Sequence, residues 1–494
     1  MTRPSPAAER DLLSMPEAGP AAVRGGAFRV GGYIIGALVG AISAALLFRH
    51  LGVIDTGRYV TAMSLVAIVA AFSDLGLTAI GLREISLRPP TERWQLAQDL
   101  LGLRIVLTLS GVALMTAIAF VGYSSTLAAG VALAGVGLLL QATQDNFAIQ
   151  LVVDLRLAWV SAFDLLRQVL NTLLILLLVL LGARLLAFLS VSIPVGVVVL
   201  ASTVILVRGR RALRPTFDRR RWLVLLGTML PYSAAVAASA LYFRIAIVLV
   251  SALASATQLG YFSASFRIVE VLTAVPALLA SAAFPIFARA ARDDHERLGY
   301  ALGRVFEVAL IVGAWLAVSI AVGAALAIKI IGGAKFYPAG QVLAVQGIAI
   351  GAMFVSAVWA NGLLGLGLYR QILTLNCAAL AANAVLVTAL VLLDGARGAA
   401  IGTSIAEIGY AIGNALLVMR GRPMLRPSLR VLPRVALAAG LGLTPLAMAG
   451  VPVIARLAIS TTLFGGTLIL TRALPPELLT LVPDFISGPR RSGA

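Results

Sequence analysis

Residues 165–207 read LLRQVLNTLLILLLVLLG, then AR, then LLAFLSVSIPVGVVVLASTVILV, which is two apolar runs separated by two residues. Each run has about twenty residues, enough for a helix to cross a hydrocarbon core about 30 Å thick. The apolar residues are continuous and do not alternate with polar ones, which favours helices over the strands of a barrel. This stretch therefore predicts two successive membrane-spanning helices.

The same pattern recurs along the whole chain. Of its 494 residues, 60% are hydrophobic and only 12% are charged, and the mean hydropathy is +0.99. Globular domains carry about a quarter charged residues. We therefore expect an all-α polytopic membrane protein with about fourteen transmembrane helices. The predicted spans are 30–48, 60–82, 101–123, 127–153, 165–182, 185–207, 223–253, 261–288, 305–331, 340–366, 372–393, 399–419, 435–450 and 451–470.

Basic links divide these spans into blocks. We expect two pseudo-symmetric six-helix lobes, residues 30–207 and 223–419, followed by two additional helices over 435–470. Residues 208–222 and 420–434 would be basic cytoplasmic links, and 1–29 and 471–494 cytoplasmic tails. No cleavable signal is predicted, because residues 1–26 are polar and lack an apolar core.

The distribution of positive charge predicts the orientation. With the N-terminus in the cytoplasm, the predicted cytoplasmic segments hold about 30 Arg and Lys residues, and the opposite side holds about six. Arg104 and Arg167, near the ends of their spans, are counted with the cytoplasmic segments. An even number of spans also returns the C-terminus to the cytoplasm. This bias supports both the orientation and the helix count.

The net charge of +18 does not indicate nucleic-acid binding, because the basic residues lie mostly in links between apolar runs. Anionic lipid headgroups are the expected partners of these basic loops. His50, His295 and the single cysteine, Cys377, lie far apart in the sequence, so a metal site is not expected. No cofactor is predicted.

A weak internal repeat relates the two lobes. Asp55-Thr-Gly-Arg-Tyr59 lies near the start of the second span, and Gln258-Leu-Gly-Tyr-Phe262 near the start of the eighth. Gly57 and Gly260 occupy corresponding places in the two segments. Helices six apart cross in the same direction, so the lobes would be parallel repeats around a central cavity.

Several motifs, in their order and spacing, resemble the polysaccharide biosynthesis flippases of the multidrug/oligosaccharidyl-lipid/polysaccharide (MOP) exporter superfamily. The resemblance covers residues 30 to about 470. It rests on Leu51-Gly-Val-Ile-Asp-Thr-Gly-Arg-Tyr59, Phe72-Ser-Asp-Leu-Gly-Leu77, Leu82-Arg-Glu84, Leu230-Pro231, Gly260-Tyr-Phe-Ser263, Arg267-Ile-Val-Glu270 and Phe284-Pro285.

This resemblance implies a flippase and not an enzyme. Two lobes around a lumen would move a polyprenyl-diphosphate-linked oligosaccharide across the bacterial inner membrane by alternating access, for O-antigen, capsule or exopolysaccharide synthesis. The lipid-linked oligosaccharide would be the substrate, and a polysaccharide polymerase and glycosyltransferases would be the partners.

Charges inside apolar helices are the candidate site residues. Arg244, Arg267 and Glu270 could line the lumen and contact a diphosphate, or they could only pair with neighbouring charges; both interpretations stay open. For Asp74 we favour a packing or gating contact. Arg58 would supply positive charge to the N-terminal lobe near the outer surface, because the span 30–48 contains no arginine. Asp145 and Glu307 are expected at membrane edges, and Glu407 inside the twelfth span.

Two other functions compete with this hypothesis. A multidrug exporter of the same superfamily would share the two lobes, but it normally has twelve helices and acidic cation sites. A membrane glycosyltransferase or polymerase would need acidic groups on an outer loop. The predicted outer loops are short, and Asp55 and Asp394 are their only obvious acids.

Overall fold

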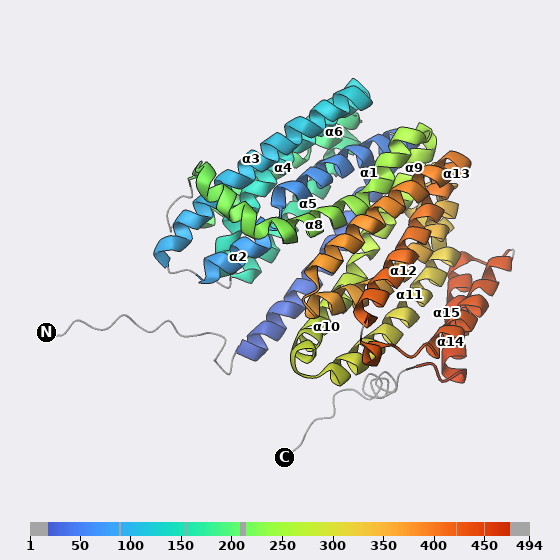
Figure 1. Cartoon of the computed structure of the whole chain (residues 1–494). Coiled ribbons are helices and arrows are strands. Elements are labelled where there is room, and N and C mark those ends of the chain that lie inside the picture. Colours follow the sequence, from blue (N-terminus) through green and yellow to red (C-terminus); the bar gives the residue numbers. More distant parts are fainter. Residues whose placement is uncertain are drawn as a thin grey trace, which may run out of the picture.

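The computed structural model describes residues 18–87, 90–153, 156–207, 214–420, 422–448 and 450–474. Within these ranges the chain is almost entirely helical and contains no strand (Figure 1). Residues 1–17 of the predicted tail 1–29, residues 475–494 of the predicted tail 471–494, and residues 208–213 of the first basic link lie outside the described residues. Residues 18–29, predicted as part of the N-terminal tail, form the beginning of the first helix.

The first helical stretch, α1 (Ala18–Asp74), contains the first predicted span, 30–48, and most of the second, 60–82. The structure interrupts the second span at Leu75 and Gly76, where φ is 40° and 71°. As one straight helix the 57 residues of α1 would be about 85 Å long, far more than a membrane needs. It is interrupted at Gly52, where φ is 72° and ψ is −175°. An L side chain rarely adopts this backbone conformation, so glycine permits the chain to turn between the two spans.

The second long stretch, α13 (Tyr369–Met419), contains the eleventh and twelfth spans. It is interrupted at Asp394 and at Gly395, where φ is 51°. The two halves pack as an antiparallel hairpin: a Cβ on Gly402 would lie 2.9 Å from the Leu386 carbonyl carbon, and one on Gly413 would lie 2.7 Å from Leu375 Cδ1. Glycine lets the two helices approach this closely.

The remaining helices cover the predicted spans with some differences. Two spans, 185–207 and 261–288, are each divided between two helices, and the helix over the span 101–123 begins at Pro90. The remaining helices are α2 (Leu77–Leu87), α3 (Pro90–Gly122), α4 (Ser125–Val153), α5 (Leu157–Leu180), α6 (Leu185–Ser190), α7 (Ser192–Val207), α8 (Arg219–Leu253), α9 (Ala256–Leu272), α10 (Ala274–Asp293), α11 (His295–Gly332), α12 (Ala339–Gly365), α14 (Val431–Leu443) and α15 (Val453–Leu470).

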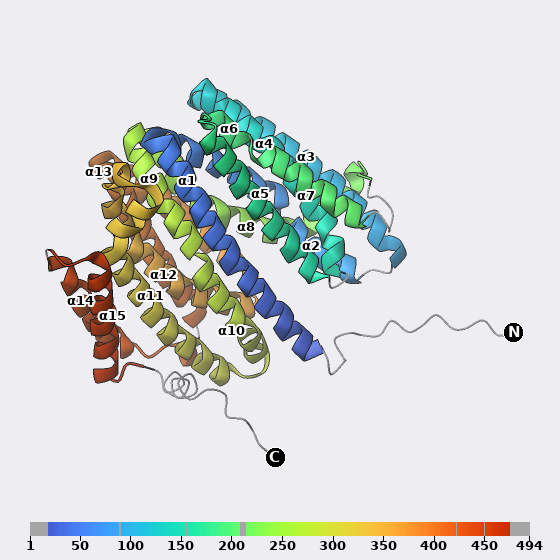
Figure 2. The same cartoon turned by 180° about the vertical axis from the view of Figure 1, so that it is seen from behind.

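Ten helices among the described residues are long and apolar enough to cross a membrane. One of them, α13, contains two of the predicted spans, and α1 contains one span and most of a second. The helices α9 and α10 follow each other with only Thr273 between them, and α14 is shorter (Figure 2). The predicted all-α polytopic architecture with about fourteen spans is therefore confirmed.

Side-chain caps explain where several helices begin. Asp218 accepts hydrogen bonds from the backbone N–H groups of Arg220 and Arg221 at the start of α8, and Asp294 accepts one from Arg297 at the start of α11. Such caps satisfy backbone donors that the first helical turn leaves free. The predicted spans leave residues 289–304 as a link between helices, whereas α10 extends to Asp293 and α11 already begins at His295.

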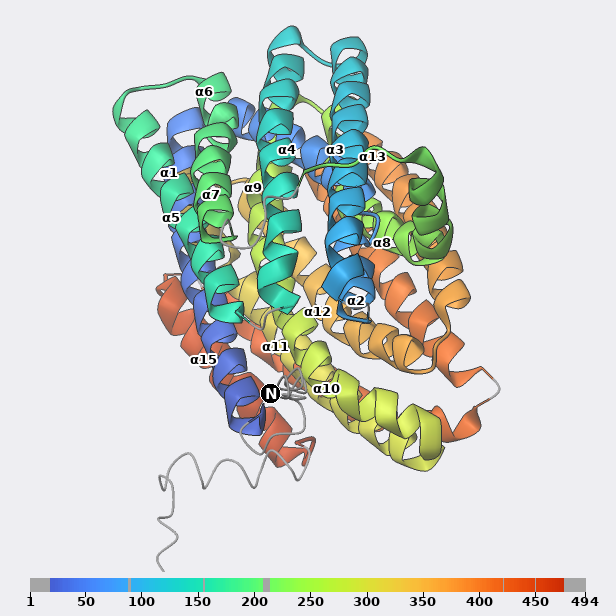
Figure 3. The same ribbon diagram turned by 90° about the vertical axis from the view of Figure 1, so that its left-hand side faces the viewer.

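The helices form two groups with α1 and α8 between them. Figure 2 shows α3, α4, α5 and α7 on one side, and in Figure 3 these four helices face the viewer; α3 contacts α4, and α4 contacts α7. On the other side α12 packs against α11, α9 and α13, while α1 contacts helices of both groups. The last two helices, α14 and α15, lie at the edge beside α11 (Figure 1). The contacts that join the two groups therefore run through α1 and α8.

Candidate functional site

Three of the predicted site residues form one cluster. Arg244 of α8 and Arg267 of α9 both donate to the carboxylate of Glu270, one to each oxygen. The Arg267 Nη1 to Glu270 Oε2 distance is 2.5 Å. Arg267 and Glu270 share a face of α9 because they are three residues apart, and α8 brings Arg244 to the same carboxylate. We call these residues the central triad.

The central triad lies against α1, which borders both groups of helices. A Cβ on Gly40 of α1 would lie 4.0 Å from Arg267 Nη2 and 3.0 Å from Gln168 Nε2 of α5. Tyr59, in the second part of α1, is within electrostatic range of both Arg267 and Glu270. The cluster therefore lies where the two helix groups meet.

The two arginines differ in their surroundings. The Arg244 guanidinium lies 5.5 Å from the centre of the Phe243 ring and 5.6 Å from that of Phe266, and its side chain is 19% exposed. The Arg267 side chain is 37% exposed. With one carboxylate for two guanidinium groups, the triad has a net charge of +1 and is suited to an anionic ligand.

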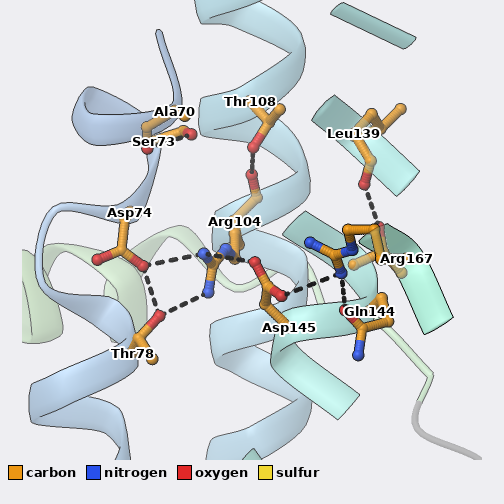
Figure 4. Close-up of polar contacts among 11 residues, drawn as sticks. Ala70, Ser73, Asp74, Thr78, Arg104, Thr108, Leu139, Gln144, Asp145 and Arg167 are labelled. Carbon is orange, nitrogen blue, oxygen red and sulfur yellow. Dashed lines mark hydrogen bonds and ion pairs between the residues drawn. The ribbon is translucent and has the colours of Figure 1, made fainter. Parts of the chain in front are cut away.

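A second charged cluster lies entirely in the N-terminal group of helices (Figure 4). Arg104 of α3 lies 2.9 Å from Asp74 and 3.9 Å from Asp145 of α4, and Arg167 of α5 lies 3.7 Å from Asp145. Arg104 also donates to Thr78, which donates to Asp74. The network ties α1, α3, α4 and α5 together.

This network corrects the interpretation of three charges. Arg104 and Arg167 were assigned to cytoplasmic segments, but they lie inside α3 and α5, and Arg104 is only 6% exposed. Asp145 was expected to be solvated at a membrane edge, but it pairs with both arginines. Asp74 makes a contact between helices, as its favoured interpretation proposed. Paired charges are the form in which ionic groups persist in an apolar interior.

Replacing Arg104 by glutamine is expected to destabilise the protein, because Asp74 loses its closest cationic partner. Breaking a buried ion pair costs about 3–5 kcal/mol, and the partial exposure of Asp74 and Asp145 places this case at or below the lower end. The thermal midpoint of the purified protein should fall. The double substitution Arg104→Gln and Asp74→Asn should recover part of the loss, whereas an additive double effect would contradict this pairing.

The other predicted charges have local partners. Arg58 forms an ion pair with Asp55 at 3.0 Å, and its side chain is 46% exposed. Among the described contacts it makes none with the central triad. Glu307 pairs with Arg304 at 2.9 Å on the same helix face. The structure therefore brings Arg244, Arg267 and Glu270 together, and it does not bring Arg58 or Asp74 to them.

Glu407 occupies a separate polar site inside the C-terminal group. Its carboxylate accepts hydrogen bonds from the Tyr242 hydroxyl at 2.5 Å and from the Ser356 hydroxyl at 3.0 Å. Both Tyr242 and Glu407 line a small cavity of about 20 Å³, together with Gln346 and Asn383. Sequence reasoning missed the hydroxyl donors, because hydroxyl side chains in apolar spans carry no charge signal. Among the described residues, no group of three or more His, Cys, Asp or Glu could hold a metal ion.

The two glycines of the internal repeat meet in the structure. A Cβ on Gly57 would lie 2.9 Å from Leu259 Cγ and 3.1 Å from the Gly260 nitrogen, and one on Gly260 would overlap the Val53 carbonyl oxygen. The second part of α1 and α9 therefore cross in direct backbone contact between the two groups. Corresponding residues of two parallel repeats come together at the axis that relates them.

The fold defines an all-helical, multi-pass membrane protein with a charged cluster between its two halves. The structure is similar to "Lipid II flippase MurJ, inward closed conformation", with a TM-score of 0.76, 11% identity, and coverage of 90% of this chain and 98% of that one. It is also similar to an inward-facing multidrug resistance MATE family transporter of the MOP superfamily, with a TM-score of 0.59, 16% identity, and coverage of 80% and 98%.

A third similar structure is a MOP superfamily transporter from Pyrococcus furiosus, with a TM-score of 0.55, 16% identity, and coverage of 83% of this chain and 96% of that one. No curated protein sequence matches the chain. The family model described as "Polysaccharide biosynthesis protein" matches residues 46–341, and the chain belongs to this family. The resemblance seen in the sequence motifs is thereby confirmed.

Proposed function

We propose that this protein is a flippase that moves a polyprenyl-diphosphate-linked oligosaccharide from the inner to the outer leaflet of a bacterial plasma membrane. The observation that carries the proposal is the central triad. Two guanidinium groups from different helices converge on one anion-sized position at the meeting of the two helix groups. Such paired guanidinium groups are suited to bidentate recognition of phosphate.

Without a protein, the movement of this cargo across a bilayer has a high free-energy barrier. A charged side chain at the bilayer centre costs at least about 2.5–3.5 kcal/mol, and a diphosphate carrying sugars costs far more. A cationic site between two lobes lowers this barrier for the headgroup, while the polyprenyl chain remains in the hydrocarbon. Because the cargo only changes sides, this function needs no catalytic residue.

The proposal includes an orientation and partners. Both termini would lie in the cytoplasm, as the distribution of arginines predicts, and the basic cytoplasmic loops would contact anionic lipids. A polysaccharide polymerase and glycosyltransferases would act after and before transport. O-antigen, capsule and exopolysaccharide are the classes of product that such a cargo would supply.

A multidrug-type exporter is the second candidate, and Glu407 favours it. This buried carboxylate has hydroxyl donors in Tyr242 and Ser356 and lines a cavity with aromatic walls that include Phe243 and Phe262. An acidic group beside aromatic rings is suited to a cation. The cavity of about 20 Å³ would have to open to admit a drug-sized compound. The two candidates use different sites in the same fold, so they can be separated by experiment.

Lipid mass spectrometry on cells depleted of this protein tests the proposal. We expect accumulation of a polyprenyl-diphosphate oligosaccharide and loss of surface polysaccharide, because the cargo would be made but not moved. Re-expression of the wild-type protein should reverse both changes. An unchanged lipid pool together with altered sensitivity to toxic organic cations would reject the flippase and support the multidrug exporter.

A further inference from the structure

We infer that Glu270 is a built-in counter-ion, which occupies Arg244 and Arg267 while the protein is empty and is displaced from them by the diphosphate of the cargo. This inference rests on the proposed flippase function and adds a specificity-determining residue to it. A lipid headgroup with little negative charge would not displace this carboxylate and would therefore bind poorly.

The geometry of the triad is that of an occupied anion site. Glu270 gives one carboxylate oxygen to Arg244 and the other to Arg267, so the two guanidinium groups share a single bridging anion. A diphosphate bridging the same groups would place one phosphate on each guanidinium. Both ligands need the inner faces of the same two side chains, so they compete for them.

The charges of the site determine which of the two anions the arginines bind. The two arginines carry +2 and Glu270 carries −1, so the empty site is left with +1. A diphosphate with two or more negative charges would leave the site with a negative sum if the carboxylate stayed in place. A carboxylate held beside the bound diphosphate repels it, so the carboxylate leaves the arginines when the diphosphate binds and turns toward its exposed side.

The exposure of the three side chains agrees with an exchange. Arg267 is 37% exposed and Glu270 is 23% exposed, whereas Arg244 is 19% exposed and lies between Phe243 and Phe266. Arg267 is therefore the group that an arriving anion meets first. Glu270 can leave by side-chain rotation, because its only described side-chain hydrogen bonds are those to the two arginines.

The consequence for function is discrimination by charge. In the empty protein Glu270 prevents two unpaired guanidinium groups in an apolar interior, which stabilises the empty state. A monophosphate headgroup offers less charge and one phosphate group, so it displaces the carboxylate poorly. A diphosphate offers one phosphate for each arginine. Glu270 thus favours diphosphate lipids over monophosphate lipids.

The test measures the binding of three probes to the full-length purified protein: farnesyl diphosphate, farnesyl monophosphate and inorganic diphosphate. We expect Glu270→Gln to bind farnesyl diphosphate about tenfold more tightly than the wild type, equivalent to about 1.4 kcal/mol. It should also gain measurable binding of farnesyl monophosphate. Glu307→Gln is the matched control, because Glu307 also pairs with an arginine three residues earlier, at 2.9 Å, and its affinities should be unchanged.

A second comparison keeps the inference testable if Glu270→Gln does not fold. Arg244→Gln alone leaves Arg267 neutralised by Glu270 and should bind farnesyl diphosphate weakly. Adding Glu270→Gln to Arg244→Gln frees Arg267 and should restore part of the affinity. Equal or weaker binding after removal of the carboxylate, in both backgrounds, would overturn the counter-ion role.

The outcomes also separate this inference from the proposed function. If the wild type binds farnesyl diphosphate but loss of Glu270 brings no gain, only the counter-ion role is wrong. If neither the wild type nor Glu270→Gln binds any of the three probes, both are wrong. If inorganic diphosphate binds as tightly as farnesyl diphosphate and responds equally to Glu270→Gln, the exchange stands and a lipid-linked cargo is rejected.

Discussion

Arg267→Ala is expected to reduce transport of the lipid-linked cargo roughly 100-fold or more, and Arg244→Ala should do the same. Each substitution removes a guanidinium from the central triad and leaves Glu270 with a single partner. Truncating one member of a buried, hydrogen-bonded charge pair costs about 2–5 kcal/mol, equivalent to between about 30-fold and several thousand-fold. Restoration of surface polysaccharide in depleted cells measures the loss.

Lysine at either position should recover only part of the activity, because an ammonium lacks the planar fork that bonds two oxygens at once. Arg397→Ala is the control. Arg397 is 55% exposed and lies 3.8 Å from Asp394, so its loss should leave transport unchanged. Full activity in both Arg244→Ala and Arg267→Ala would remove the central triad from the cargo site.

Gly260→Ala is expected to have the second large effect, a loss of both stability and transport. A Cβ at this position would overlap the Val53 carbonyl oxygen, and a backbone atom cannot rotate away as a side chain can. The second part of α1 and α9 would have to separate where they now cross. Overpacking of this kind costs about 1–3 kcal/mol. The thermal midpoint of the purified protein and complementation of depleted cells provide the two measurements.

Gly409→Ala is the matched control for the crossing, because a Cβ at Gly409 meets nothing within 4 Å. It should change neither stability nor transport. Normal stability and transport in Gly260→Ala would show that the crossing of α1 and α9 tolerates an added methyl group, and the close contact would then have no role in the packing of the two halves.

Most of the fold could be predicted from the sequence, since each span is a local feature. A run such as 185–207 has enough apolar residues to cross a bilayer whatever lies beside it. The turns inside α1 and α13 were also predicted, because short polar or glycine-containing segments separate the paired spans. The links were predicted less well. Asp294 caps α11 at His295 and makes helix of residues that were expected to form a loop.

The candidate site was predicted only in part. Arg267 and Glu270 could be related from sequence, because three residues separate them on one helix. The placement of Arg244 on the same carboxylate requires α8 and α9 to be adjacent, which no local pattern indicates. Arg104 and Arg167 were assigned to cytoplasmic segments, because an arginine near the end of an apolar run looks the same whether it reaches water or an aspartate on another helix.

The sequence by itself determined the class of structure. In a bilayer every backbone group must be bonded within its own helix, so apolar runs of sufficient length specify helices, and the arginines between them predict the orientation. Only the tertiary structure decided which charges are paired. The Arg244–Glu270 pair and the Arg104–Asp74–Asp145 network join residues on different helices, and the contact of Gly57 with Gly260 joins the two halves of the repeat. Such pairings depend on how helices pack against one another, and the residues that meet in this packing are far apart in the sequence.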